Sequence, residues 1–201
     1  MRTDLWYDSC GLGKIHACRW TPEGEVKAVL QIIHGIAEFV ERYEDFANYL
    51  NKQGILVVAE DHMGHGQSIN NGGIQGYFHG GWFAAVADSY KLLEDTKQEF
   101  PQVPYILFGH SMGSFMARTI LCKNPDSGID AAIICGTGWQ PAKLLPMVRN
   151  LKMQGETIPV GKTGWGEMYD IYGDGNLHSV MLFVSSQQKQ LIRAITEAEG
   201  N

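Results

Sequence analysis

The pentapeptide Gly109-His110-Ser111-Met112-Gly113 constrains the fold of this chain more than any other stretch. It follows a short apolar run at 105–108, typical of a buried strand, and precedes 115–120, where apolar residues recur at helical spacing. A strand that turns sharply into a helix at G-x-S-x-G strains the serine backbone, and the glycines allow close approach. A chance Gly-Ser turn is the alternative, but the flanking elements favour the elbow. The pattern predicts that Ser111 stands above a sheet and that the Met112 amide can bind an oxyanion.

The composition fits one globular domain over residues 1–201. Hydrophobic residues make up 44% of the chain and charged residues 19%. The net charge of -6 and the lack of a basic cluster argue against a nucleic-acid partner. The cysteines lack metal-binding spacing, so we expect no metal and no cofactor, and Cys122 and Cys135 are expected to be buried free thiols. Without an apparent signal peptide or membrane span, a cytoplasmic location is expected.

Up to residue 138, buried-strand patterns alternate with helical patterns. This alternation predicts an α/β fold, a mostly parallel sheet with helices on both faces, with functional loops at the carboxyl ends of the strands. The expected strands are 28–33, 55–59, 105–108 and 131–135, and the expected helices are 43–52 and 83–100. Residues 5–9 and 14–20 are expected to form an antiparallel hairpin at one edge. Beyond residue 138, we expect a residual cap at 139–160 and a last strand at 178–184.

Three further motifs accompany the elbow. They are His34-Gly35-Ile36-Ala37-Glu38, Glu60-Asp-His-Met-Gly-His-Gly-Gln-Ser68 and Gly76-Tyr77-Phe78. In this order, with the elbow, they resemble the monoacylglycerol lipase and lysophospholipase branch of the α/β-hydrolases, also described as serine aminopeptidase-like. The resemblance implies an α/β-hydrolase fold, here with a truncated cap and truncated C-terminal strands.

The same resemblance implies a serine ester hydrolase that works through an acyl-serine intermediate. Its nucleophile would be Ser111, with the amides of Ile36 and Met112 as the oxyanion hole. The implied substrates are acyl esters, such as monoacylglycerols, lysophospholipids or short carboxylic esters. The residues expected to contact substrate are His34, Gly35, His110 and Trp139.

Several polar residues are expected to have structural roles. The Gly-rich spacing of Asp61, His62 and His65 fits a turn stabilised by side-chain bonds to backbone amides better than a metal site. The His110 side chain is expected to point along the turn and to be structural. His16 lies in the expected edge strand, so we predict a surface residue.

The general base and the acid are the open part of the site. In this fold they follow the nucleophile in the order Ser, acid, His. His178 is the only histidine after Ser111, which makes it the candidate base, and Asp170 or Asp174 is the candidate acid. His178 begins the expected last strand, however, and a strand of six or seven residues spans about 20 Å, so it would lie near the rim opposite Ser111.

The family pattern leaves the same question open, because Ile158 and Gln188 occupy the places where it has the acid and the histidine. A rearranged His34, His62 or His79 could serve instead, or a partner chain could complete the triad. The alternative function is a catalytically impaired protein that binds an acyl ligand. A third hypothesis is a homo-oligomer formed through exposed sheet edges. Transient contact with a membrane or micelle also stays open.

Overall fold

In the computed structural model, the described residues are 1–71 and 75–138. They form a six-stranded sheet with the strand order β1-β2-β4-β3-β5-β6. The expected cap at 139–160 and the expected strand at 178–184 lie outside the described residues. So do Trp139, Asp170, Asp174 and His178, whose roles stay predictions.

The sheet is mostly parallel, as the sequence predicted. Its strands are β1 (Arg2–Asp8), β2 (Lys14–Trp20), β3 (Ala28–Ile33), β4 (Ile55–Glu60), β5 (Tyr105–His110) and β6 (Ala131–Cys135). The hairpin of β1 and β2 pairs antiparallel with β4, whereas β4, β3, β5 and β6 run parallel to one another. The carboxyl ends of β3, β4 and β5 therefore meet at one edge, where the loops carrying the sequence motifs begin.

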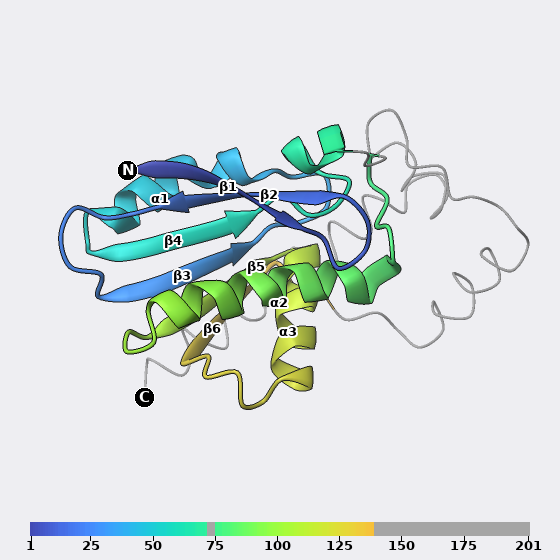
Figure 1. Cartoon of the computed structure of the whole chain (residues 1–201). Coiled ribbons are helices and arrows are strands. Elements are labelled where there is room, and N and C mark those ends of the chain that lie inside the picture. Colours follow the sequence, from blue (N-terminus) through green and yellow to red (C-terminus); the bar gives the residue numbers. More distant parts are fainter. Residues whose placement is uncertain (72–74, 139–201) are drawn as a thin grey trace, which may run out of the picture. The chain divides into compact units, whose positions relative to one another are not determined.

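Helices cover both faces of this sheet. They are η1 (Val40–Tyr43), α1 (Glu44–Asn51), η2 (Gly66–Asn71), α2 (Gly81–Glu99) and α3 (Met112–Lys123). Figure 1 shows α2 and α3 together on one side of the sheet and α1 on the other. No helix among the described residues is both long and apolar enough to cross a membrane.

The core consists of two apolar layers, one on each face. Under α2 and α3, Val29 and Leu56 pack with Leu93 and Ile120. Under α1, the layer contains Ala47 together with its strand partners Trp20, Leu30, Ile32 and Val57. Adjacent strand residues point to opposite faces, so both layers draw on each central strand, which explains the continuous apolar runs. Each such fully buried aliphatic side chain contributes about 1.5–3 kcal/mol to folding.

The strand β5 extends beyond the sequence prediction, and two cysteines are less buried than predicted. The strand β5 continues to His110, because Gly109 pairs with Ile33 of β3 and His110 pairs with Cys135 of β6. Cys122, predicted to be buried, is exposed near the end of α3, and Cys135 is only partly buried. Both are free thiols, and so are Cys10 and Cys18.

Candidate active site

Ser111 lies between β5 and α3 with the strained backbone that the elbow motif predicts. Its φ is 51° and its ψ is -117°, a conformation that L-residues rarely adopt. The Ser111 amide donates to the Cys135 carbonyl oxygen at 2.9 Å, and the Ser114 hydroxyl donates to the Ser111 carbonyl at 2.5 Å. These bonds hold the residue in a conformation that costs of order 1–3 kcal/mol.

Close packing requires both glycines of the elbow. A Cβ atom on Gly113 would lie only 1.9 Å from the Ile33 carbonyl oxygen at the end of β3. A Cβ atom on Gly109 would lie 2.8 Å from the Ser114 Cα. The first turn of α3 therefore rests directly on the ends of β3 and β5, which sets the height of Ser111 above the sheet.

The loop after β3 lies against the nucleophile. A Cβ atom on Gly35 would be 3.0 Å from the Ser111 Cβ, so the backbone of this loop is in near contact with the serine. Ala37, in the same loop, has a φ of 56°, and in the described part of the chain it and Ser111 are the non-glycine residues with positive φ. Backbone strain of this kind is typical of functional sites.

Glu38 fixes the conformation of this loop. Its Oε2 accepts hydrogen bonds from the Gly35 amide at 2.6 Å and from the Tyr43 hydroxyl at 3.0 Å. The same oxygen lies 3.0 Å from Nδ1 of His110, which belongs to the elbow strand. Although burial opposes it, these partners lower the pKa of Glu38, with His110 the largest contributor. One ionised carboxylate thus ties the loop to the elbow.

Of the two amides predicted to form the oxyanion hole, that of Met112 directly follows Ser111, and that of Ile36 lies in the loop that contacts Ser111 through Gly35. Met112 is the first residue of α3, where amides have no acceptor within the helix. Among the backbone hydrogen bonds between described residues, none uses the Ile36 amide as donor. An anion at this position would meet free N–H groups and the positive end of the helix dipole.

The buried histidines His34 and His62 form hydrogen bonds at the start of the loop after β3 and are not free to act as bases. Nδ1 of His34 lies 2.7 Å from the Gly35 carbonyl oxygen, and its Nε2 accepts from the His62 amide at 3.2 Å. Burial lowers the pKa of His34 well below its usual value, so it is neutral. Nε2 of His62 lies 3.0 Å from the His34 carbonyl and its Nδ1 3.2 Å from Oε1 of Glu60. Both rings therefore have both nitrogens engaged.

The loop after β4 has the structural role that its sequence predicted. The Asp61 carboxylate accepts hydrogen bonds from the Val40 amide at 2.8 Å and the Gln67 amide at 2.9 Å. His65 is buried against Phe78, and desolvation lowers its pKa to about 4. Asp61 therefore orders the turn that bears these residues and joins it to η1.

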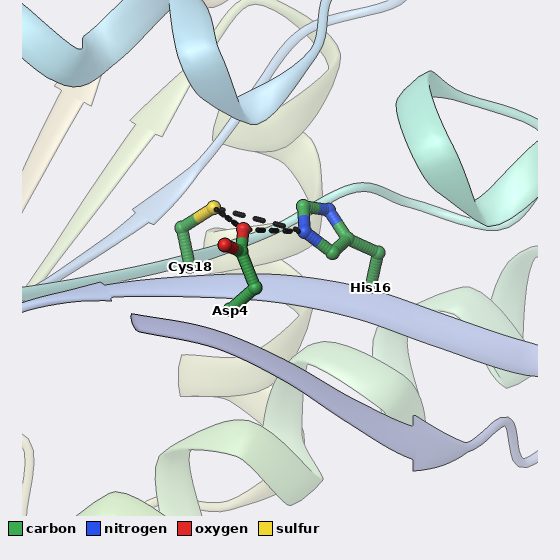
Figure 2. Close-up of side chains that lie close together, drawn as sticks. All are labelled: Asp4, His16 and Cys18. Atoms are coloured by element: carbon green, nitrogen blue, oxygen red, sulfur yellow. Dashed lines mark hydrogen bonds and ion pairs between the residues drawn. The ribbon is translucent and has the colours of Figure 1, made fainter. Parts of the chain in front are cut away.

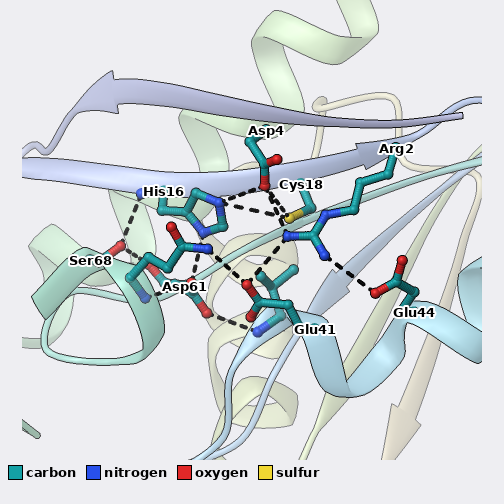
Figure 3. Close-up of polar contacts among 10 residues, drawn as sticks. Arg2, Asp4, His16, Cys18, Glu41, Glu44, Asp61 and Ser68 are labelled. Atoms are coloured by element: carbon teal, nitrogen blue, oxygen red, sulfur yellow. Dashed lines mark hydrogen bonds and ion pairs between the residues drawn. The ribbon is translucent and has the colours of Figure 1, made fainter. Parts of the chain in front are cut away.

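The prediction that His16 is a surface residue was wrong. His16 is fully buried, with Nδ1 2.7 Å from Asp61 and Nε2 3.0 Å from Asp4. Figure 3 shows this line of polar contacts from Ser68 and Asp61 through His16 to Asp4 and Arg2. The sequence does carry a signal, because His16, Cys18 and Trp20 alternate along β2 and so share a face.

The described residues bring together the nucleophile and the loop that carries Gly35 and Ile36. Gly35 is in near contact with Ser111, Met112 follows it as the first residue of α3, and no hydrogen bond joins the Ser111 hydroxyl to another residue of 1–71 or 75–138. His110 is directed to Glu38. Sequence reasoning assigned no role to Glu38 and Tyr43, although Glu38 ends the quoted loop motif.

A serine on a strand-to-helix elbow, beside free amides at the carboxyl edge of a mostly parallel sheet, defines the α/β-hydrolase class. Residues 24–191 match the family described as serine aminopeptidase, S33, and the chain belongs to this family. It is 35% identical to the human monoglyceride lipase over 114 residues, which cover 56% of this chain and 36% of that protein.

A monkeypox virus monoglyceride lipase homolog is 32% identical over 152 residues, covering 75% of this chain and 53% of the viral protein. Among solved structures, a thermostable carboxyl esterase from Bacillus coagulans aligns with a TM-score of 0.72 and 29% identity, covering 86% of this chain and 56% of the esterase. The chain thus spans about a third to a half of the length of these curated relatives.

Proposed function

We propose that this protein is a serine ester hydrolase that cleaves acyl esters through an acyl-Ser111 intermediate. The observation that carries the proposal is the contact between the Gly35 loop and Ser111. The amides of Ile36, in that loop, and of Met112, the first residue of α3, would form the oxyanion hole. The serine would attack the ester carbonyl, and the alcohol would leave. The oxyanion would accept hydrogen bonds from the two amides, and water would then release the acid.

Apolar side chains at the rim of the site support an acyl substrate. Ile36 and Phe39, on the oxyanion loop, are each 42% exposed, so apolar surface borders the position of the ester carbonyl. The named relatives point the same way, since two of them are monoglyceride lipases or their homologs and a third is a carboxyl esterase. We therefore propose monoacylglycerols or related single-chain esters as the substrate class.

Proton transfer is the remaining requirement of this mechanism. His34 and His62 have both ring nitrogens engaged. We propose His178 as the base, with Asp170 or Asp174 as the acid, and His79 stays the alternative base. Trp139 and His110 remain proposed substrate contacts. Since Ile158 and Gln188 stand where the family pattern has the acid and histidine, the rival function is non-catalytic binding of an acyl ligand.

The test is intact mass after incubation with a fluorophosphonate, which reacts only with an activated serine. We expect stoichiometric labelling within minutes, its loss in Ser111→Ala, and a decrease of about 10³-fold or more in rate in His178→Gln. His79→Gln tests the alternative base and should label at the wild-type rate if His178 is the base.

No labelling of folded wild-type protein over hours would overturn the hydrolase proposal and favour the acyl-binding function. Labelling that survives His178→Gln would preserve the nucleophile but refute this assignment of the base. Hydrolysis of a monoacylglycerol and a short-chain ester by the same preparation would then define the substrate class.

A further inference from the structure

Three metal-binding atoms meet on one face of the β1–β2 hairpin, away from the elbow. Asp4 pairs with Cys18 across the two strands, and His16 precedes Cys18 by two residues, so the three side chains share a face. Nε2 of His16 lies 3.0 Å from Oδ1 of Asp4, and Sγ of Cys18 lies 3.3 Å from that oxygen and 3.8 Å from Nε2. Figure 2 shows the three converging on one point.

This triangle has the dimensions of a zinc site. Zinc binds nitrogen and oxygen at about 2.0–2.2 Å and thiolate sulfur at about 2.3 Å, so tetrahedral ligands stand about 3.3–3.8 Å apart. The three separations fall within or a few tenths of an ångström outside that range. A nitrogen, a sulfur and a carboxylate oxygen are also the ligand types that zinc takes in proteins.

His16 is oriented as a metal-bound histidine usually is. Its other nitrogen, Nδ1, lies 2.7 Å from the buried carboxylate of Asp61, which directs Nε2 at Asp4 and Cys18. Asp61 is itself held by the amides of Val40 and Gln67, and the Trp6 ring covers His16 with the ring centroids 5.0 Å apart. The imidazole therefore needs no rearrangement to bind an ion.

One oxygen of Asp4 carries more donors than it can bind well. His16, the Cys18 thiol and the Arg2 guanidinium all donate to Oδ1, which has two lone pairs. Arg2 has other acceptors 3.3 Å away, Glu41 and Glu44, which remain available to it if Asp4 binds a cation. A bound cation would replace the protons that His16 and Cys18 direct at Oδ1, so fewer donors would compete for this oxygen.

We propose that Asp4, His16 and Cys18 bind one Zn²⁺ ion, with a water in the fourth position. Both nitrogens of His16 face carboxylate oxygens, so without metal the ring carries two protons and the thiol carries one. Binding forms Zn–N, Zn–S and Zn–O bonds and releases the Nε2 and Sγ protons to solvent. Two positive charges enter with the ion and two leave as protons, so the net charge of the site, and hence its repulsion toward Arg2, does not increase.

The site would join elements that are distant in sequence. The ion links β1 to β2, and His16 carries the connection through Asp61 to the loop after β4 and to the Val40 amide of η1. Zinc binding would therefore stabilise the folded state by mass action, independently of the proposed esterase activity.

The experiment is titration of the full chain with Co²⁺ and Zn²⁺ in weakly buffered solution. We expect one ion per chain, a thiolate-to-cobalt charge-transfer band that Zn²⁺ abolishes, and release of about two protons per ion. The triple variant Cys10→Ser, Cys122→Ser, Cys135→Ser retains Cys18 as its only thiol and should give the same band. Cys18→Ser should weaken binding at least 100-fold, while Cys122→Ser should not change it.

Binding of less than one ion per chain at micromolar free Zn²⁺ would overturn the proposal. So would a cobalt complex without the thiolate band, or affinity unchanged by Cys18→Ser. If Cys18→Ser fails to fold, as judged by circular dichroism, the band and the proton release of the triple variant decide the question alone.

Discussion

The Glu38 carboxylate accepts a hydrogen bond from the Gly35 amide at 2.6 Å. The backbone of this same glycine is in near contact with the Ser111 side chain. The side chain that ends the loop motif thus sets the position of the motif's own backbone. The loop that we propose to present the Ile36 amide to an oxyanion would in this way be fixed before any substrate arrives.

Replacement of Glu38 tests this positioning role. Loss of a charge-assisted hydrogen bond costs about 1.5–3 kcal/mol, so Glu38→Ala should slow fluorophosphonate labelling of Ser111 about 10–100-fold. The exposed Glu23, between β2 and β3, provides the matched control Glu23→Ala. Equal labelling rates in the two variants would show that the loop holds its position without Glu38.

The close packing of Gly113 predicts a large effect on stability. An added Cβ would lie 1.9 Å from the Ile33 carbonyl oxygen, so Gly113→Ala has to displace α3 or β3 and should cost about 3 kcal/mol or more. Gly24→Ala is the control, because that position has open space and only a positive φ of 94°. It should cost about 1–2 kcal/mol. Urea unfolding measures both, and similar losses would contradict the packing argument.

Tyr7 supplies a hydrogen bond to a buried carboxylate. Its hydroxyl donates to Glu60 and lies 3.1 Å from the Asp88 carbonyl, and burial raises the pKa of Tyr7 so that the proton is retained. Tyr7→Phe should lower the free energy of unfolding by about 1–3 kcal/mol. The exposed Tyr49 offers the control Tyr49→Phe, expected to stay within about 0.5 kcal/mol. An unfolding free energy unchanged by Tyr7→Phe would mean that Glu60 is satisfied without it.

His65 predicts how stability depends on pH. Desolvation lowers its pKa in the folded state to about 4, below the ordinary value of 6.5, so the unfolded chain binds more protons between these pH values. Stability contributed by neutral His65 is present above pH 6.5 and is lost as pH falls toward 4, by up to about 1.4 kcal/mol per pH unit. The difference in unfolding free energy between wild type and His65→Gln, measured from pH 7.5 to 4, should show this slope. A difference independent of pH would refute it.

The central sheet could be predicted from sequence because its strands are mainly apolar, with single polar residues such as Gln31 of β3. Both faces of β3 are buried, so the run from Ala28 to Ile33 has no polar alternation and matches the observed strand at both ends. The end of β5 was less predictable, because Gly109 and His110 have low strand preference. They are extended only because β3 and β6 pair with them, a tertiary effect that local sequence does not contain.

For the site, the motifs located Ser111 and the oxyanion loop, since each motif encodes a backbone conformation. Side-chain partners were harder to infer, because His16 depends on the register between β1 and β2 and on Asp61, 45 residues away. Nothing in a single sequence reports that register directly. For the same reason, the sequence did not predict that Asp4, His16 and Cys18 lie close together, and their spacing matches no metal motif.

The hydrogen bond from the Ser111 amide to the Cys135 carbonyl has a consequence for biosynthesis. A nascent chain cannot complete the elbow until residue 135 has left the ribosome and β6 has paired with β5. Because this contact joins residues 24 positions apart, its loop must close before the strained φ of Ser111 is stabilised. A reactive serine would therefore be assembled late, after most of the parallel sheet exists to support it.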